Sequence, residues 1–118
     1  AFLGSFVTSR ENGIAHGLLF GTLMRLAGAD SSVFPNYGGR FSFSREECAE
    51  IAAATATPLA GIKPIFPAPG GGMTLERLPD LRALYGSEVI LLIGGALHRP
   101  GPDLEANARL FCAEARGK

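Results

Sequence analysis

The segment Pro67-Ala68-Pro69-Gly70-Gly71-Gly72-Met73 and the later segment Glu88-Val89-Ile90-Leu91-Leu92-Ile93-Gly94-Gly95 decide the fold of this chain. Consecutive glycines follow a strand-like segment in each case, residues 62–66 before the first and the apolar run 89–93 within the second. This pattern is typical of a β-strand that opens into a turn. Glycine leaves φ free and allows bare backbone N–H groups to approach an anion. The two segments therefore predict neighbouring glycine turns that together would bind a phosphate group.

Helical and strand-like periods alternate along the rest of the chain. Apolar residues at three- and four-residue spacing predict a helix over residues 12–27, in which Gly17 and Gly21 indicate close packing on a neighbour. Ser44 followed by Glu47 is a capping-box pattern that opens a helix reaching about residue 54. The remaining expected elements are strands at 31–34, 62–66 and 89–93, a helix from Pro79 in its first position to Gly86, and a helix over 103–116.

This order of elements predicts repeated β/α units. A continuous apolar strand between helices, such as 89–93, is typical of a parallel sheet covered on at least one face. In (β/α)8 barrels, the turns after the seventh and eighth strands commonly bind phosphate, so one pattern predicts both fold and ligand class. Three parallel strands are too few to close a barrel and would leave unpaired edges. We therefore expect the C-terminal part of a (β/α)8 TIM barrel over 1–118, with the other strands in a longer protein.

Composition excludes several classes of protein. Of the 118 residues, 47% are hydrophobic, yet no apolar run approaches the ~20 residues of a membrane helix, so we expect a soluble chain without a signal peptide. Eleven basic residues balance eleven acidic ones without a basic block, which argues against nucleic acid as a partner. Cys48 and Cys112 form no CxxC or Cys/His cluster, so we expect two buried, reduced thiols and a cytoplasmic protein.

Several segments resemble the ribulose-bisphosphate carboxylase (RuBisCO) large chain. Residues 71–86, GGMTLERLPDLRALYG, and their continuation to Ile93-Gly94-Gly95 resemble the seventh and eighth β/α units of its barrel. Earlier, Asn12-Gly13-Ile14, the RLAGAD segment at 25–30, and Gly38-Gly39-Arg40 resemble the fifth helix, the sixth strand and the mobile sixth loop. The resemblance thus covers nearly the whole chain and implies the region from helix 5 through helix 8.

The resemblance implies a phosphate site made of backbone amides. Family members bind one substrate phosphate through amides that match Gly72, Gly94 and Gly95, and the residue matching Gly71 shapes the turn. All four glycines are present here. Taken singly, each glycine pair is also explained as plain turn punctuation, and it is their spacing and order that favour phosphate.

Two positions depart from the carboxylases. Arg40 stands where they have a lysine that reaches over the substrate, and Gly70 stands where they have a serine. A guanidinium is a planar fork suited to bidentate oxyanion binding, whereas an ammonium is a mobile point charge, so CO2 fixation is disfavoured. Residues 35–41, PNYGGRF, resemble the RuBisCO-like proteins, which enolise, isomerise or decarboxylate phosphorylated ketose-like compounds. Arg40 is the candidate catalytic residue, and a solvated loop arginine explains it equally well. Asn36 is a candidate substrate contact, but an asparagine in a turn is more often there for its backbone conformation.

The resemblance also implies Mg2+, held by carboxylates and a carbamylated lysine, and proton abstraction next to a carbonyl. Those ligands belong to earlier strands, so we expect no metal ligand in this segment and an inactive chain in isolation. A homodimer is implied for the full-length protein, in which a second subunit covers the barrel mouth.

Three alternatives remain open from the sequence. A true carboxylase fragment would share the same turns. A flavodoxin-like phosphate-binding module lacks support, because no GxGxxG or P-loop pattern follows a strand. A non-catalytic half-barrel would assemble with its missing part and show no phosphate affinity. The substrate is also open among methylthio-sugar phosphate isomerisation, enolisation and apionate-pathway decarboxylation.

Overall fold

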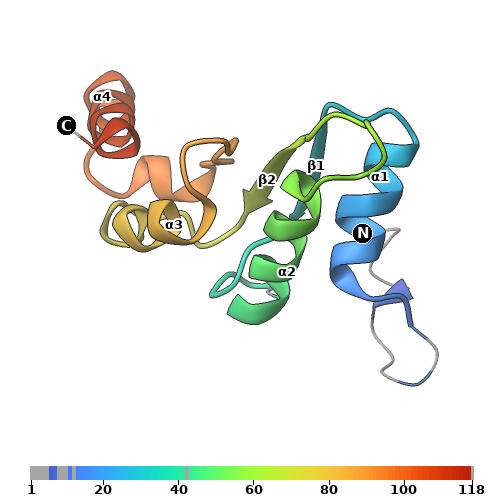
Figure 1. Ribbon diagram of the computed structural model, residues 1–118. Helices are drawn as coiled ribbons and strands as arrows, with labels where there is room; N and C mark the ends of the chain where they lie inside the picture. The colour runs from blue at the N-terminus through green and yellow to red at the C-terminus, as the bar shows by residue number, and fades with distance from the viewer. Residues whose placement is uncertain (1–5, 8–10, 12, 42, 118) are drawn as a thin grey trace.

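The computed structural model describes residues 6–7, 11, 13–41 and 43–117 (Figure 1). A π-helix at Leu18–Thr22 runs into α1 at Leu23–Leu26. The elements that follow are β1 at Ser31–Pro35, α2 at Arg45–Ala56, β2 at Phe66–Gly70, a 3-10 turn at Leu75–Arg77, α3 at Leu78–Tyr85, a second 3-10 turn at Gly95–His98 and α4 at Leu104–Arg116. The predicted alternation of helical and extended segments is confirmed.

Two strands and a third extended segment run in parallel. β1 pairs with β2 in a register that sets Ser31 opposite Phe66 and Pro35 opposite Gly70. On the far side of β2, Gly70 forms an isolated parallel bridge with Leu92. The carboxyl ends of all three segments therefore lie at one edge of the sheet, which is where parallel α/β folds place their binding loops.

The strand predicted at 62–66 is wrong by four residues, because the ladder begins only at Phe66, whose N–H donates to Asp30 O at 3.1 Å. Successive N–H groups of a strand point to opposite edges, so Pro67 and Pro69 direct their missing donors away from β1. The two prolines therefore remove no hydrogen bond between β1 and β2. The first of the three glycines is consequently part of the strand rather than of the turn.

The continuous strand predicted at 89–93 is also wrong. Ile90 and Leu92 donate their N–H groups to Pro67 O at 3.0 Å and Pro69 O at 3.2 Å, but the prolines have no N–H to return. A regular parallel ladder needs donors from both partners. The segment therefore lies extended beside β2 with a single bridge at Leu92.

The helix ends follow the predicted signals closely. Ser44 and Glu47 form the predicted capping box of α2, with both reciprocal bonds at 3.1 Å. Asp103 caps α4 through its side chain, and Gly86 ends α3 with a φ of 74°. Pro79 stands in the second rather than the first position of α3, because the helix begins at Leu78.

The first predicted helix is shorter than expected. Residues 13–15 are not helical and the helix runs over 16–26, while Asn12 lies outside the described residues. Its close packing on α2 is confirmed, since a Cβ on Gly21 would lie 2.4 Å from Ala54 Cβ and one on Gly17 would lie 2.9 Å from Glu50 Cγ.

The sheet is covered on one face and open on the other. Phe34 on β1 is 2% exposed and packs into a core with residues of α2 and α3, including Ile51, Leu78 and Leu81. The opposite face presents a row of exposed apolar side chains, Val33, Phe66, Ile90 and Leu92. A parallel sheet with helices on one face and an uncovered apolar face on the other is the architecture of part of a (β/α)8 barrel.

A buried arginine holds the connection into β2. Arg25 is 3% exposed and donates to four backbone carbonyls, those of Ala54 at 3.0 Å, Thr57 at 2.5 Å, Ile62 at 2.8 Å and Lys63 at 3.1 Å. These bonds hold residues 62–63, which the sequence had suggested as strand. Helix α1 is thereby joined to the end of α2 and to the chain that leads to β2.

Both cysteines are free, but only Cys48 is buried, so the prediction of two buried thiols is wrong for the exposed Cys112. Within the described ranges, no helix has the length and apolar character needed to cross a membrane.

Candidate phosphate site

Three glycine-containing loops leave the same edge of the sheet. The loop of residues 36–40 follows β1, the turn at Gly71-Gly72 follows β2, and Gly94-Gly95 follows the extended segment. The register explains this placement, because Pro35 lies opposite Gly70 and Gly70 bridges Leu92. The sequence prediction that the two glycine turns are neighbours is consistent with this arrangement, and the loop bearing Arg40 joins them.

The Gly71-Gly72 turn has a backbone that suits glycine. Their φ values are 102° and 65°, in the left-handed region where side chains are strained. Asn36 N–H donates to Gly70 O at 2.8 Å, and Asn36 Nδ2 donates to Gly71 O at 3.4 Å. In a trans peptide the C=O and N–H groups point in opposite directions, so the Asn36 bond to Gly71 O turns the N–H of Gly72 away from Asn36.

Asn36 lies inside the protein. Its side chain is fully buried, and its Oδ1 accepts a hydrogen bond from the Tyr85 hydroxyl at 2.7 Å. Burial raises the pKa of Tyr85, so its hydroxyl stays protonated and can donate this bond. Asn36 therefore holds the Gly71-Gly72 turn, whereas its predicted contact with a substrate stays a prediction.

The loop after β1 packs on this turn backbone to backbone. A Cβ on Gly39 would lie 3.1 Å from Gly71 C, and a Cβ on Gly72 would lie 2.9 Å from Gly38 O. Arg77 lies between the two loops, with Nη1 donating to Gly72 O at 2.9 Å and Nη2 donating to Tyr37 O at 2.8 Å. This contact could not be predicted from the sequence, because an arginine at the start of a helix resembles any solvated charge.

Tyr37 is fixed from two sides. Its ring lies under the Arg77 guanidinium at 4.7 Å and near that of Arg45 at 5.9 Å, and its hydroxyl donates to the Asp80 carboxylate. Asp80 also pairs with Arg45 at 3.3 Å. The Tyr37 hydrogen bond and then Arg45 lower the pKa of Asp80, while desolvation and then Asp80 raise that of Tyr37.

The second glycine turn is more open. Gly94 has φ −113° and ψ −110°, its carbonyl accepts from Leu97 N at 2.9 Å, and a short 3-10 turn starts at Gly95. A Cβ on either glycine would meet no atom of the described residues within 4 Å. Among the residues that the structure describes, no acceptor is found for the N–H groups of Gly72, Gly94 and Gly95. These donors are thus available to a ligand, and their convergence on one phosphate stays a prediction.

Arg40 is exposed at the tip of its loop. Its guanidinium carbon lies 5.4 Å from the centroid of the Phe41 ring. Phe41 is itself 78% exposed, so this contact leaves the arginine accessible to solvent and to a ligand.

A metal site does not assemble in this part of the chain. Over the described ranges, no group of three or more His, Cys, Asp or Glu side chains is arranged to hold an ion. The described residues therefore do not offer the carboxylate set that Mg2+ needs.

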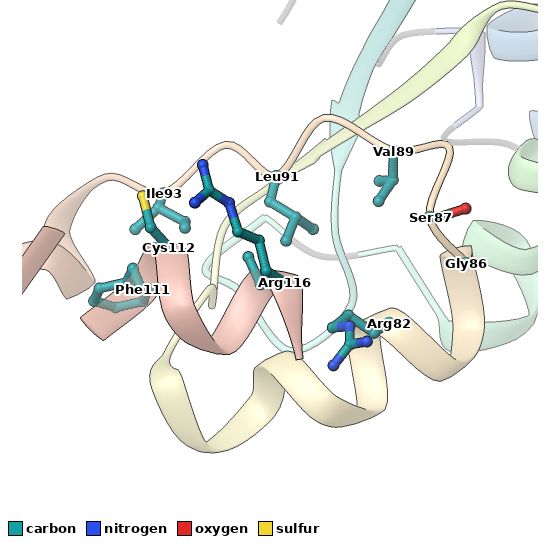
Figure 2. A pocket seen from close by; sticks show the side chains of 10 residues that line it. Arg82, Gly86, Ser87, Val89, Leu91, Ile93, Phe111, Cys112 and Arg116 are labelled. Atoms are coloured by element: carbon teal, nitrogen blue, oxygen red, sulfur yellow. The ribbon is translucent and has the colours of Figure 1, made fainter. Parts of the chain in front are cut away.

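A separate cavity of about 640 Å³ lies between α3, α4 and the extended segment (Figure 2). Its apolar lining includes Val89, Leu91 and Ile93, with Arg82 and Arg116 among its polar residues. It contains none of the predicted site residues.

Comparison with known proteins gives clear matches over nearly the whole chain, although no family model matches it. The chain is 46% identical to ribulose bisphosphate carboxylase-like protein 1 of Rhodopseudomonas palustris over 101 residues, 86% of this chain and 27% of that protein. It is 41% identical to the 5-methylthioribulose-1-phosphate isomerase of Rhodospirillum rubrum over 117 residues, 99% of this chain and 31% of that enzyme.

Comparison with solved structures points to the same group of proteins. A Rubisco-like protein from Alicyclobacillus acidocaldarius superposes with a TM-score of 0.83 at 30% identity, covering 97% of this chain and 28% of that one. The chain thus spans less than a third of the length of the proteins it matches.

Proposed function

We propose, from the homology of this chain to the RuBisCO-like proteins, that it supplies the phosphate-binding loops of an enzyme acting on a phosphorylated ketose-like substrate. The reaction is an enolisation or isomerisation next to a carbonyl, with decarboxylation as a variant of the same chemistry. An isomerase of a phosphorylated methylthio-sugar among the relatives supports this substrate class.

One observation carries the proposal. Three glycine-containing loops leave one edge of the sheet, and the turn at Gly71-Gly72 is held by Asn36 with the N–H of Gly72 directed away from it. Phosphate binding by backbone amides needs glycines at the turn and donors free of internal partners. Gly72, Gly94 and Gly95 meet the first condition, and among the residues that the structure describes they also meet the second.

Arg40 favours isomerisation over carboxylation. A guanidinium on an exposed loop next to the glycine turns can bind an anionic oxygen through two parallel N–H bonds. The compact ammonium of a lysine would act instead as a single mobile charge. In this proposal Arg40 contacts the substrate and neutralises negative charge, while proton abstraction is performed by groups outside this segment.

The assembly and location belong to the same proposal. The Mg2+ implied by the resemblance would be held by residues outside this segment, where it would supply a Lewis acid. The full-length enzyme is a cytoplasmic homodimer, and the two free cysteines fit a reducing compartment. The uncovered apolar row on the sheet fits burial inside a complete barrel.

The test is a calorimetric titration of the intact protein with inorganic phosphate, carried out on the wild type and on Gly95→Ala. A methyl group at Gly95 enters open space and leaves the fold intact, but it limits how closely a phosphate oxygen can approach the amide. We expect about tenfold weaker binding, equivalent to about 1.4 kcal/mol.

Gly101→Ala is the matched control. A Cβ there has its nearest contact at 4.0 Å, on Asn107 Oδ1, so this variant keeps the wild-type phosphate affinity. Equal phosphate affinities of wild type, Gly95→Ala and Gly101→Ala would contradict the site, as would absence of phosphate binding by the wild-type protein.

A further inference from the structure

We propose that Arg77 is a positioning residue that couples the Arg40 loop, residues 36–40, to the Gly71-Gly72 turn. Because of this coupling, the loop becomes less mobile when the turn becomes less mobile. Its consequence for catalysis rests on the proposed function, because it links phosphate binding at the turn to the placement of Arg40.

The hydrogen bonds of Arg77 join the two loops directly. One guanidinium nitrogen donates to Gly72 O at 2.9 Å and the other donates to Tyr37 O at 2.8 Å. Tyr37 stands three residues before Arg40, and Gly72 carries one of the amides assigned to phosphate. A planar fork can satisfy two carbonyls on separate loops at once, which a single ammonium cannot reproduce.

The space for the guanidinium is provided by two glycines. A Cβ on Gly38 would lie 2.6 Å from Arg77 Nη1, and a Cβ on Gly72 would lie 2.5 Å from the same atom. A side chain at either position would displace the guanidinium. The glycines of both loops therefore form the slot that Arg77 occupies, and each has a positive φ, 76° and 65°, that suits glycine.

The aromatic ring of Tyr37 completes the slot. Arg77 lies 4.7 Å from the centroid of this ring, within cation–π distance. The ring cannot turn away freely, because the Tyr37 hydroxyl donates to Asp80 on helix α3. Arg77 is thus held by a stack and two hydrogen bonds, and it is only partly exposed.

Coupling follows from this geometry. Arg77 restrains the peptide after Gly72, while Asn36 restrains the peptide before it. A ligand that orders the turn therefore also orders the carbonyl to which Arg77 is bound, and through it Tyr37. Coupling between two sites is reciprocal, so ordering the loop strengthens binding at the turn by the same factor.

The experiment is hydrogen–deuterium exchange followed by mass spectrometry on the intact protein, comparing peptides that cover residues 36–43 and 70–76. Arg77→Lys keeps the charge but not the fork. Gly38→Ala displaces the guanidinium without changing Arg77, but it also strains the loop at a φ of 76°, so Arg77→Lys decides the outcome. Arg109→Lys, on an exposed surface pair with Glu105, is the control.

Without phosphate, we expect both Arg77→Lys and Gly38→Ala to raise exchange in the two peptides about tenfold, while α2 and α4 keep wild-type exchange. With inorganic phosphate, wild type becomes protected in both peptides, whereas Arg77→Lys becomes protected only at 70–76 and at higher phosphate concentration. Wild-type exchange in Arg77→Lys, or faster exchange spread equally over all helices, would overturn the positioning role.

The two proposals fail separately. If phosphate protects neither peptide of the wild-type protein, the phosphate site is overturned, while the arm without phosphate still decides whether Arg77 couples the loops. If phosphate protects 70–76 in wild type and Arg77→Lys changes nothing, the phosphate site stands and the coupling is overturned.

Discussion

The Tyr85 hydroxyl donates to Asn36 Oδ1 over 2.7 Å, and this bond joins the end of α3 to the end of β1 inside the core. The same asparagine donates to Gly71 O through its Nδ2. Asn36 thus links helix α3 to the backbone of the glycine turn through two hydrogen bonds. A buried amide can do this because both ends of its side chain are hydrogen-bonded.

Tyr85→Phe should therefore destabilise the fold. The variant keeps the ring but leaves Asn36 Oδ1 buried and unpaired, a loss of about 1–2 kcal/mol in the free energy of unfolding. Urea denaturation measures this loss. Tyr37→Phe, which removes an exposed hydroxyl bond to Asp80, is the control and should cost clearly less. Equal effects of the two variants would contradict the role of the buried bond.

Stability should fall in acid partly through Asp80. The Tyr37 hydroxyl and Arg45 lower the pKa of Asp80 in the folded state, so the folded protein holds that proton less tightly than the unfolded chain does. The contribution of Asp80 is therefore present above pH about 4, the unperturbed value, and is lost as pH falls through the folded pKa.

Asp80→Asn should make the acid branch of the stability curve shallower. The slope of stability against pH is measured from urea unfolding midpoints at pH values from about 6 to about 2, a range that brackets the unperturbed carboxylate pKa. Glu114→Gln, on α4 away from this cluster, is the control and should leave the slope as in wild type. An Asp80→Asn slope identical to that of wild type would show that the link to Tyr37 and Arg45 does not contribute.

Arg25→Ala should be among the most destabilising substitutions of a charged residue. It would leave four carbonyl groups without their donor, among them those of Ala54 and Thr57 at the end of α2. An unpaired buried group costs about 1–3 kcal/mol, but these four bonds are only part-buried and water entering the gap recovers part of the sum, so we expect about 3 kcal/mol or more.

Arg109→Ala is the matched control for this prediction. Arg109 pairs with Glu105 on the exposed face of α4 with both side chains more than half exposed, and such pairs contribute about 0–1 kcal/mol. Comparable losses for Arg25→Ala and Arg109→Ala in urea denaturation would contradict the assigned role of the buried arginine.

Local signals predicted the helices and the turns well. The capping box of Ser44 and Glu47 and the helix end at Gly86, which has a positive φ, are each specified by residues within one turn of the helix end. The glycine turns were found for the same reason, since Gly71 and Gly72 adopt the positive φ that glycine alone favours. These features depend on chemistry that is adjacent in sequence.

Non-local contacts were missed. The position of β2 depends on which edge Pro67 and Pro69 face, and this is decided only when β1 lies on the other side. Arg25 and Arg77 resemble solvated arginines in the sequence, yet their donors reach carbonyls 29 to 40 residues away. Periodicity carries no information on such pairs, because their partners are backbone groups that every residue has.

Arg40→Ala should separate binding from folding. The guanidinium is exposed and contacts only the exposed Phe41 ring among the interactions described for it, so its removal leaves the unfolding midpoint unchanged. If Arg40 contacts the substrate, the affinity of the intact protein for a ketose phosphate should fall about tenfold, as expected for the loss of one charge-assisted contact. Arg40→Lys should recover only part of this affinity, because the ammonium keeps the charge but not the two-pronged geometry. Calorimetry measures the affinity of both variants for the ketose phosphate. Wild-type affinity in Arg40→Ala would show that this arginine does not contact the substrate.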